Sequence, residues 1–174
     1  MDHVQHIAML GLMGSGKTTV GTLVADALGW PLIDSDLVVL ERTGMSVAQL
    51  WERGGEPAYR PHEREAVTQA LAGPGPDVVA VAAGAIEDPV AVASIRQRGV
   101  LRVWLRARPE TLAHRVQLSD HRPLIDEDPL GVLAAQADAR AEDFAEVADL
   151  VLDMEDRAPG ALASAIVDEA RSQA

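Results

Sequence analysis

The sequence contains no cysteine, only one lysine and few aromatic side chains. Without cysteine the protein has neither disulfide bonds nor thiolate metal ligands, and a cytoplasmic location is the natural expectation. No apolar run approaches the length of a membrane-spanning helix. The short apolar stretch at residues 7–13 runs directly into glycines and a lysine, which is unlike a signal peptide.

The chain has 174 residues, of which 48% are hydrophobic, a composition typical of a globular protein that buries its own core. We therefore expect one domain over residues 1–174. The formal net charge of −12 disfavours binding to nucleic acid or to anionic membranes. The expected partner is a small molecule, and we expect a monomer. A polyanionic ligand would require arginines gathered at its site against this overall charge.

Short apolar runs alternate with helix-like stretches along the chain. The apolar runs cover residues 6–12, 31–36, 78–85, 100–107 and 149–154, and residues 18–30 follow the first run with helical spacing. Uninterrupted apolar strands are typical of a parallel sheet that is covered on both faces. The pattern predicts an α/β fold in which helices flank a five-stranded parallel sheet. Residues 37–62 and 118–130 break the alternation, and the second of these stretches is a candidate lid.

The segment Gly11–Thr18 satisfies the pattern G-x-x-x-x-G-K-[ST] and lies between a predicted strand and a predicted helix, the context that identifies a P-loop. Its glycines let backbone N–H groups turn towards phosphate oxygens, and the helix N-terminus adds positive charge. Lys17, the only lysine, supplies a compact ammonium for the terminal phosphates, and Thr18 offers a hydroxyl to Mg²⁺. The predicted ATP-binding residues of the loop are Gly14, Ser15, Gly16, Lys17, Thr18 and Thr19.

Two carboxylates, Asp34 and Asp36, close the second predicted strand. Ligands of α/β proteins bind at this edge of the sheet, so the pair is placed to serve a metal ion and to accept a proton. A turn that caps the following helix would explain the same residues without any catalytic role.

The sequence resembles the shikimate kinase family over nearly its whole length. The resemblance rests on GLMGSGKTTVG, IDSDLVVLERTG, GGEPAYRPHE, HRPL, RAEDF and DRAPG. It implies a fold like that of the P-loop nucleoside monophosphate kinases, with an acceptor-binding insertion at about 37–62 and a lid at about 118–130. It also implies ATP- and Mg²⁺-dependent phosphorylation of the 3-hydroxyl of shikimate.

The resemblance also implies a role for individual residues. Asp34 helps Thr18 to hold Mg²⁺, and Asp36 contacts the acceptor hydroxyl as the candidate base. Arg60 and Arg140 bind the acceptor's carboxylate, for which a planar guanidinium is well suited. Pairing with the abundant acids of the chain would explain these arginines without a substrate.

Four further residues match the nucleotide side of the family's site. Arg122 matches the lid arginine that stabilises charge during transfer, and it completes a predicted catalytic set with Lys17 and Asp36. Arg115 matches an arginine near the adenine, and Arg157 and Pro159 match the loop that covers the base. On the acceptor side, Trp51 and Tyr59 match aromatics that flank the acceptor ring.

One segment departs from the family's pattern. Ala82-Ala83-Gly84 stands where shikimate kinases carry three glycines, whose backbone approaches the acceptor; Ala83 and Gly84 are the predicted contacts. Each alanine adds a methyl group and restricts φ. A kinase for another hydroxy acid, such as gluconate or a cyclitol acid, and a non-catalytic ATP-binding module therefore stand as alternatives.

Overall fold

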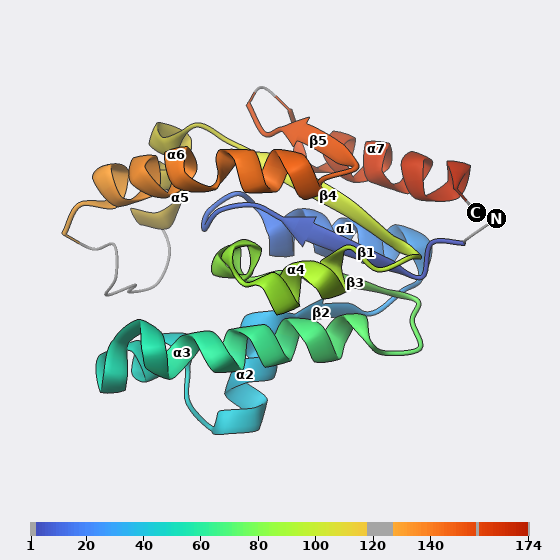
Figure 1. Cartoon of the computed structure of the whole chain (residues 1–174). Coiled ribbons are helices and arrows are strands. Elements are labelled where there is room, and N and C mark those ends of the chain that lie inside the picture. The colour runs from blue at the N-terminus through green and yellow to red at the C-terminus, as the bar shows by residue number, and fades with distance from the viewer. Residues whose placement is uncertain (1–2, 118–126, 156, 174) are drawn as a thin grey trace.

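The computed structural model of the protein describes residues 3–117, 127–155 and 157–173 (Figure 1). The strands are β1 (His6–Leu10), β2 (Leu32–Asp34), β3 (Asp77–Ala80), β4 (Val100–Arg106) and β5 (Leu150–Asp153). The helices are α1 (Lys17–Leu28), α2 (Ser35–Thr43), α3 (Val47–Leu71), the 3₁₀ helix η1 (Ala83–Glu87), α4 (Pro89–Ile95), α5 (Pro109–Gln117), α6 (Pro129–Val147) and α7 (Pro159–Ser172).

The five strands form one parallel sheet in the order β2-β3-β1-β4-β5, which confirms the predicted fold class. β1 is central and pairs with β3 on one side and with β4 on the other. The helix that follows β1 packs on one face of the sheet, whereas the helices that follow β3 pack on the opposite face. The carboxyl ends of β1 and β3 therefore open into a crevice, the position at which open α/β sheets bind ligands.

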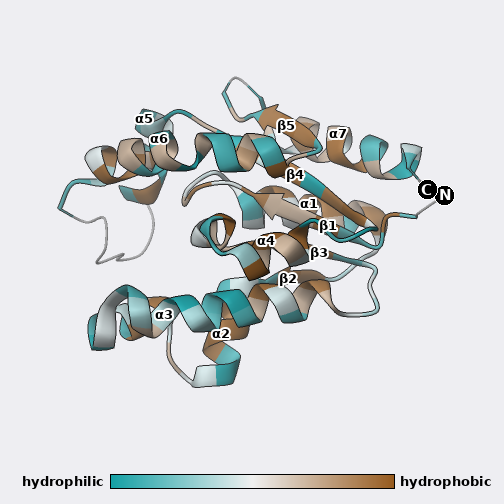
Figure 2. Cartoon of the chain, viewed as in Figure 1, coloured by the Kyte–Doolittle hydropathy of each residue, from teal (hydrophilic) through white to brown (hydrophobic). Residues whose placement is uncertain are grey.

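Alternate residues of β1 point into two separate cores. Ile7 and Met9 pack with α1 and α7, whereas Ala8 and Leu10 pack with helices α3 to α6 (Figure 1). Each of these four side chains is at most 1% exposed. Figure 2 shows the central strands as hydrophobic segments between amphipathic helices. Both faces are covered, which is why the strands appear in the sequence as unbroken apolar runs.

All five strands are shorter than the predicted apolar runs, most clearly β2 and β3. β2 ends at Asp34, which caps α2 by accepting a hydrogen bond from the Asp36 backbone N–H, so Asp36 lies in the first turn of a helix. β3 ends at Ala80, and the chain then turns into η1. Apolar composition alone did not locate these ends, because residues beyond a strand can remain buried in the core.

The predicted acceptor insertion, residues 37–62, is helical and belongs to α2 and the first half of α3. The turn signals in this stretch produce a kink within α3, where Gly55 has a φ of 63°. A small core of Val39, Leu50, Tyr59 and Ala66 joins the two helices. This core fixes the start of α2 against α3.

The candidate lid lies mostly outside the described residues, which exclude 118–126. Its last two positions, 129 and 130, begin α6. Within the part of the chain that the structure describes, no helix is long and apolar enough to cross a membrane.

Candidate functional site

The P-loop connects the end of β1 to the start of α1. Gly14 and Gly16 have φ angles of 82° and 86°, a backbone conformation that L-residues with a side chain rarely adopt. α1 begins directly after Gly16, so the N-terminal N–H groups of the helix face the crevice without a side-chain cap. This arrangement is the anion-binding geometry that the sequence pattern predicts.

Lys17 folds back over the loop that precedes it. Its Nζ donates to the carbonyl oxygens of Gly11, at 2.8 Å, and of Leu12, at 3.0 Å. The three donors of an ammonium can serve two carbonyls and still reach a further oxygen. The loop thus holds its cation beside the N-terminus of α1, where a phosphate would bind.

Thr18 and Asp34 are in direct contact. The Thr18 hydroxyl donates to Asp34 Oδ2 at 3.0 Å, while Asp34 Oδ1 accepts the Asp36 backbone N–H at 3.0 Å. Among the described residues no group of three or more His, Cys, Asp or Glu side chains could hold a metal ion. A hydroxyl and one carboxylate nevertheless fit Mg²⁺, which in phosphoryl-transfer sites takes few protein ligands and completes its shell with phosphate oxygens and water.

Asp36 is held from the opposite side by Tyr59 of α3. The Tyr59 hydroxyl donates to Asp36 Oδ1 at 3.1 Å, and the Tyr59 side chain is buried. Burial, together with the charges of Asp36 and Glu63, raises the pKa of Tyr59 far above its ordinary value. The phenol therefore remains protonated and acts as a hydrogen-bond donor at any accessible pH.

Arg60 and Arg140 both reach η1, from α3 and α6 respectively. Arg60 donates to Glu56 and Glu63 at 2.7 Å each, and Arg140 Nη2 donates to Glu87 at 2.7 Å. Pairing with acids, the alternative interpretation of the sequence, is thus real. The arginines are buried or half-buried, whereas the acids range from buried (Glu63) to exposed (Glu56 and Glu87). Arg140 is 7% exposed and Glu63 is 2% exposed.

Burial and charge pairing together set the pKa values of Glu63 and Arg60. Burial raises the pKa of the Glu63 carboxyl, although the neighbouring Arg60 guanidinium lowers it in part. Burial opposes the charged form of Arg60, yet Glu63 and Glu56 together raise the pKa of Arg60 above its ordinary value. Arg60 therefore stays cationic, as the binding of a carboxylate requires.

Gly84 occupies a position where an added side chain would displace the Arg60 guanidinium. A Cβ atom built on Gly84 would lie 1.4 Å from Arg60 Nη1, so the guanidinium packs directly against the backbone of η1. The two alanines before it are not strained. Ala82 has φ −57° and ψ 137° and donates its N–H to Ser35 Oγ at 2.9 Å, and Ala83 begins η1. The alanines therefore keep a backbone conformation that any residue adopts, and only at the third position would a methyl group displace Arg60.

One cleft of about 580 Å³ brings most of the predicted residues together. On the nucleotide side it is lined by Gly14, Gly16, Lys17, Thr18, Thr19, Asp34, Arg115 and Pro159. On the acceptor side it is lined by Asp36, Trp51, Tyr59, Arg60, Ala83, Gly84 and Arg140. Arg115 donates to the carbonyl of Gly14 at 3.3 Å and so ties α5 to the P-loop.

Three predicted residues stand apart from that cleft. The Ser15 side chain is buried beneath the loop at 1% exposure, so Ser15 could reach a ligand only through its backbone. Arg157 is exposed and does not line the cleft. Arg122 lies outside the described residues.

The cleft also contains residues that sequence reasoning missed. Glu63, Gln136 and Met154 line it beside the predicted set. Gln136 precedes Arg140 by four residues on α6, a spacing that places both side chains on one helix face and would have identified it. Nothing local marks Met154, which reaches the P-loop because it follows β5 at the same sheet edge.

The comparisons with known proteins agree with this geometry. A family model described as shikimate kinase matches residues 13–171. The shikimate kinase of Moorella thermoacetica is 38% identical over 162 residues, which cover 92% of this chain and 91% of that protein. The shikimate kinase of Symbiobacterium thermophilum is 41% identical over 146 residues, which cover 82% of this chain and 83% of that protein.

Solved structures show the same relationship. The shikimate kinase of Acinetobacter baumannii in complex with shikimate has a TM-score of 0.91 at 29% identity, covering 98% of this chain and 95% of that chain. A gluconokinase of Sinorhizobium meliloti 1021 has a TM-score of 0.60 at 21% identity, covering 99% of this chain and 93% of that chain. The second likeness shows a shared fold alone.

Proposed function

The chain belongs to the shikimate kinase family, and we propose on that basis that it transfers the γ-phosphoryl group of ATP to the 3-hydroxyl of shikimate. One observation carries the proposal: a single cleft joins the P-loop and its acidic neighbours to two arginines that reach one 3₁₀ helix. The first half of the cleft suits a nucleoside triphosphate, and the second suits a small carboxylated polyol.

On the nucleotide side, the backbone N–H groups at the start of α1 and the Lys17 ammonium bind the phosphates. Arg115 and Pro159 line the cleft where the base would lie, and Arg157 would join them from the exposed loop before α7. Thr18 and Asp34 would hold Mg²⁺, which when bound offsets the negative charge of the phosphates. Arg122 would add a cation from the lid.

On the acceptor side, Arg60 and Arg140 bind the carboxylate and so fix the orientation of the ring. Ala83 and Gly84 form the wall against which the ring lies, and Trp51 and Tyr59 line the cleft around it. Asp36, whose Oδ1 accepts from Tyr59, orients the 3-hydroxyl and accepts its proton as the oxygen attacks phosphorus. Positioning and electrostatic stabilisation supply most of the rate enhancement, because phosphoryl transfer asks little covalent chemistry of the protein.

The proposal includes one kinase domain over residues 1–174 that works as a cytoplasmic monomer without binding nucleic acid or membranes. The net charge of −12 supports the last two points. A gluconate-like acceptor is not favoured, because the gluconokinase is less similar to this chain in both TM-score and sequence identity than the shikimate kinase is. A module without catalytic activity is disfavoured by the presence of Lys17, Asp34 and Asp36 in one cleft.

A coupled assay of ADP release tests the proposal. We expect release that depends on both shikimate and Mg²⁺, that stops when the metal is chelated, and that is far slower with gluconate. Turnover with gluconate but not with shikimate would contradict the proposal and identify the protein as a kinase for the alternative acceptor. ATP binding without turnover on any hydroxy acid would leave only a nucleotide-binding module.

A further inference from the structure

Glu87 lies between the two arginines that we assign to the acceptor's carboxylate. Its Oε2 accepts from Arg140 Nη2 at 2.7 Å and lies 3.7 Å from Arg60 Nη2. The Glu87 side chain is 44% exposed and belongs to η1, the 3₁₀ helix whose first residues line the cleft. A carboxylate of the protein thus contacts the same pair of cations as the acceptor's carboxylate would.

Glu87 contacts only one of the two nitrogens, Nε and Nη2, that a carboxylate can bind together on one edge of the Arg140 guanidinium. Arg140 Nε is buried and has no hydrogen-bond partner among the described residues. A buried donor without a partner is costly, so Arg140 gains from any carboxylate that satisfies Nε and Nη2 together.

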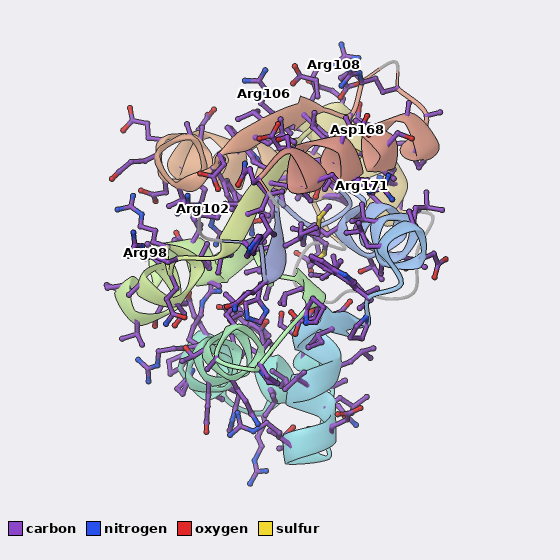
Figure 3. The ribbon with its side chains drawn as sticks, turned by 90° about the vertical axis from the view of Figure 1, so that its right-hand side faces the viewer. Arg98, Arg102, Arg106, Arg108, Asp168 and Arg171 are labelled. Carbon is purple, nitrogen blue, oxygen red and sulfur yellow. The ribbon has the colours of Figure 1, made fainter. Side chains whose placement is uncertain are left out.

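The same chain shows the complete arrangement elsewhere. Arg106, labelled in Figure 3, donates to Asp153 through Nε at 2.6 Å and through Nη2 at 2.9 Å. Arg102, also labelled there, uses the same two nitrogens to bind both oxygens of Asp149. Side-on pairing through Nε and Nη2 is therefore the geometry these arginines adopt with an unconstrained carboxylate, and Arg140 lacks the Nε half of it.

Charge also limits how many carboxylates this group can hold. Arg60 and Arg140 already face Glu56, Glu63 and Glu87, so two cations are matched with three carboxylates. An acceptor would bring a fourth negative charge. Glu63 is too buried to leave. The Glu56 side chain is 57% exposed, but it contacts only the Arg60 Nε atom, so its departure would leave Arg140 occupied. The Glu87 side chain is 44% exposed and contacts both cations. Glu87 is therefore the carboxylate whose departure frees both cations, and its exposure lets it return to water.

We propose that Glu87 is a placeholder carboxylate, which occupies Arg140 in the absence of acceptor and is displaced when the acceptor's carboxylate binds. This inference rests on the proposed function. Glu87 prevents repulsion between Arg60 and Arg140 in the empty site, and it lowers the affinity for acceptors. It also increases the preference for carboxylated acceptors over neutral polyols, because a neutral polyol has no carboxylate that replaces Glu87 on Arg140.

Steady-state kinetics of Glu87→Gln test the inference. The amide keeps the shape of Glu87 but removes its charge, so we expect the KM for shikimate to fall by about threefold to tenfold. The kcat and the KM for ATP stay within about twofold of the wild type, because Glu87 contacts neither the P-loop nor Asp36. The matched control is Glu146→Gln, which removes an exposed carboxylate that pairs with Arg96 at the same distance of 2.7 Å; it leaves the KM for shikimate unchanged.

A rise in the KM for shikimate in Glu87→Gln would overturn the inference, because Glu87 would then hold Arg140 in its productive position. An unchanged KM would overturn it as well. If the wild-type protein shows no turnover with shikimate, the proposed function fails separately. The inference is then decided by the increase in melting temperature on adding acetate: a larger increase for Glu87→Gln than for the wild type and Glu146→Gln supports it, and an equal increase contradicts it.

Discussion

The hydroxyl oxygen of Tyr59 lies 3.1 Å from Asp36 Oδ1, and this bond joins the middle of α3 to the first turn of α2. The backbone N–H of Asp36 donates to Asp34 Oδ1 at the end of β2, so the sheet fixes the backbone of Asp36 while α3 fixes its carboxylate. The proposed base is therefore held in place by an element that is distant in the sequence.

Removing that hydroxyl in Tyr59→Phe leaves the ring and its packing in place. We expect kcat to fall by at most about fivefold and the free energy of unfolding to fall by about 1 kcal/mol, as is typical of one lost hydrogen bond. The KM for ATP stays unchanged. Kinetics and urea denaturation measure the two effects, and an increase in kcat would contradict the positioning role of Tyr59.

Replacing the proposed base in Asp36→Asn removes the acceptor for the hydroxyl proton but keeps the size of the side chain. We expect kcat to fall by about 10²-fold or more, in the range of general-base effects. ATP affinity, measured by calorimetry, stays near the wild-type value because Asp36 serves the acceptor side of the cleft. Retention of most of the turnover would show that another group accepts the proton or that none is needed.

Exchanging the single lysine in Lys17→Arg tests the need for an ammonium. A guanidinium is planar and wider, so it cannot donate to Gly11 and Leu12 and also reach the terminal phosphates. We expect a loss in kcat of about 10²-fold, comparable to the removal of other transition-state contacts. Arg171→Lys makes the reverse exchange at the exposed end of α7 and is expected to have no effect (Figure 3).

Gly84→Ala introduces a methyl group at the atom position that Arg60 occupies. Because Arg60 must move, we expect the KM for shikimate to rise by about tenfold or more, as expected when a charge-assisted contact is lost. Gly160→Ala is the matched control, since nothing lies within 4 Å of its added Cβ atom. A normal KM in Gly84→Ala would show that Arg60 does not bind the acceptor from this position.

Glu63 gives the stability of the protein a defined dependence on pH. Burial raises the pKa of its carboxyl in the folded state above the ordinary value of 4.5, so the folded protein binds this proton more tightly than the unfolded chain. The contribution of this bound proton to the free energy of unfolding is fully present below pH 4.5 and is lost as the pH rises through the folded-state pKa of Glu63. The wild type should therefore lose stability relative to Glu63→Gln over this window, as urea denaturation at a series of pH values would reveal. Glu52→Gln, at an exposed position, should show no such trend.

Much of the fold could be predicted because local patterns carried the information. The five apolar runs identify the five strands, and the P-loop pattern identifies the first turn of α1 with its glycines and lysine. The end of β3 at Ala80 could not be predicted, since the residues beyond it are also apolar and buried or half-buried. The end of β2 at Asp34 is set by the cap that Asp34 makes for α2. The kink at Gly55 was visible as a turn signal, but its location within a helix depends on the packing of α2 against α3.

The sequence by itself determined the nucleotide half of this site, because one continuous segment supplies the loop, the helix N-terminus, Lys17 and Thr18. Only the tertiary structure decided the acceptor half. Arg60, Gly84, Glu87 and Arg140 come from three elements, and their contacts depend on how α3 and α6 pack beside η1. Tertiary packing also showed that the first two alanines of Ala82-Ala83-Gly84 are tolerated. They adopt ordinary backbone angles, whereas a side chain at the remaining glycine would displace the Arg60 guanidinium that occupies this space.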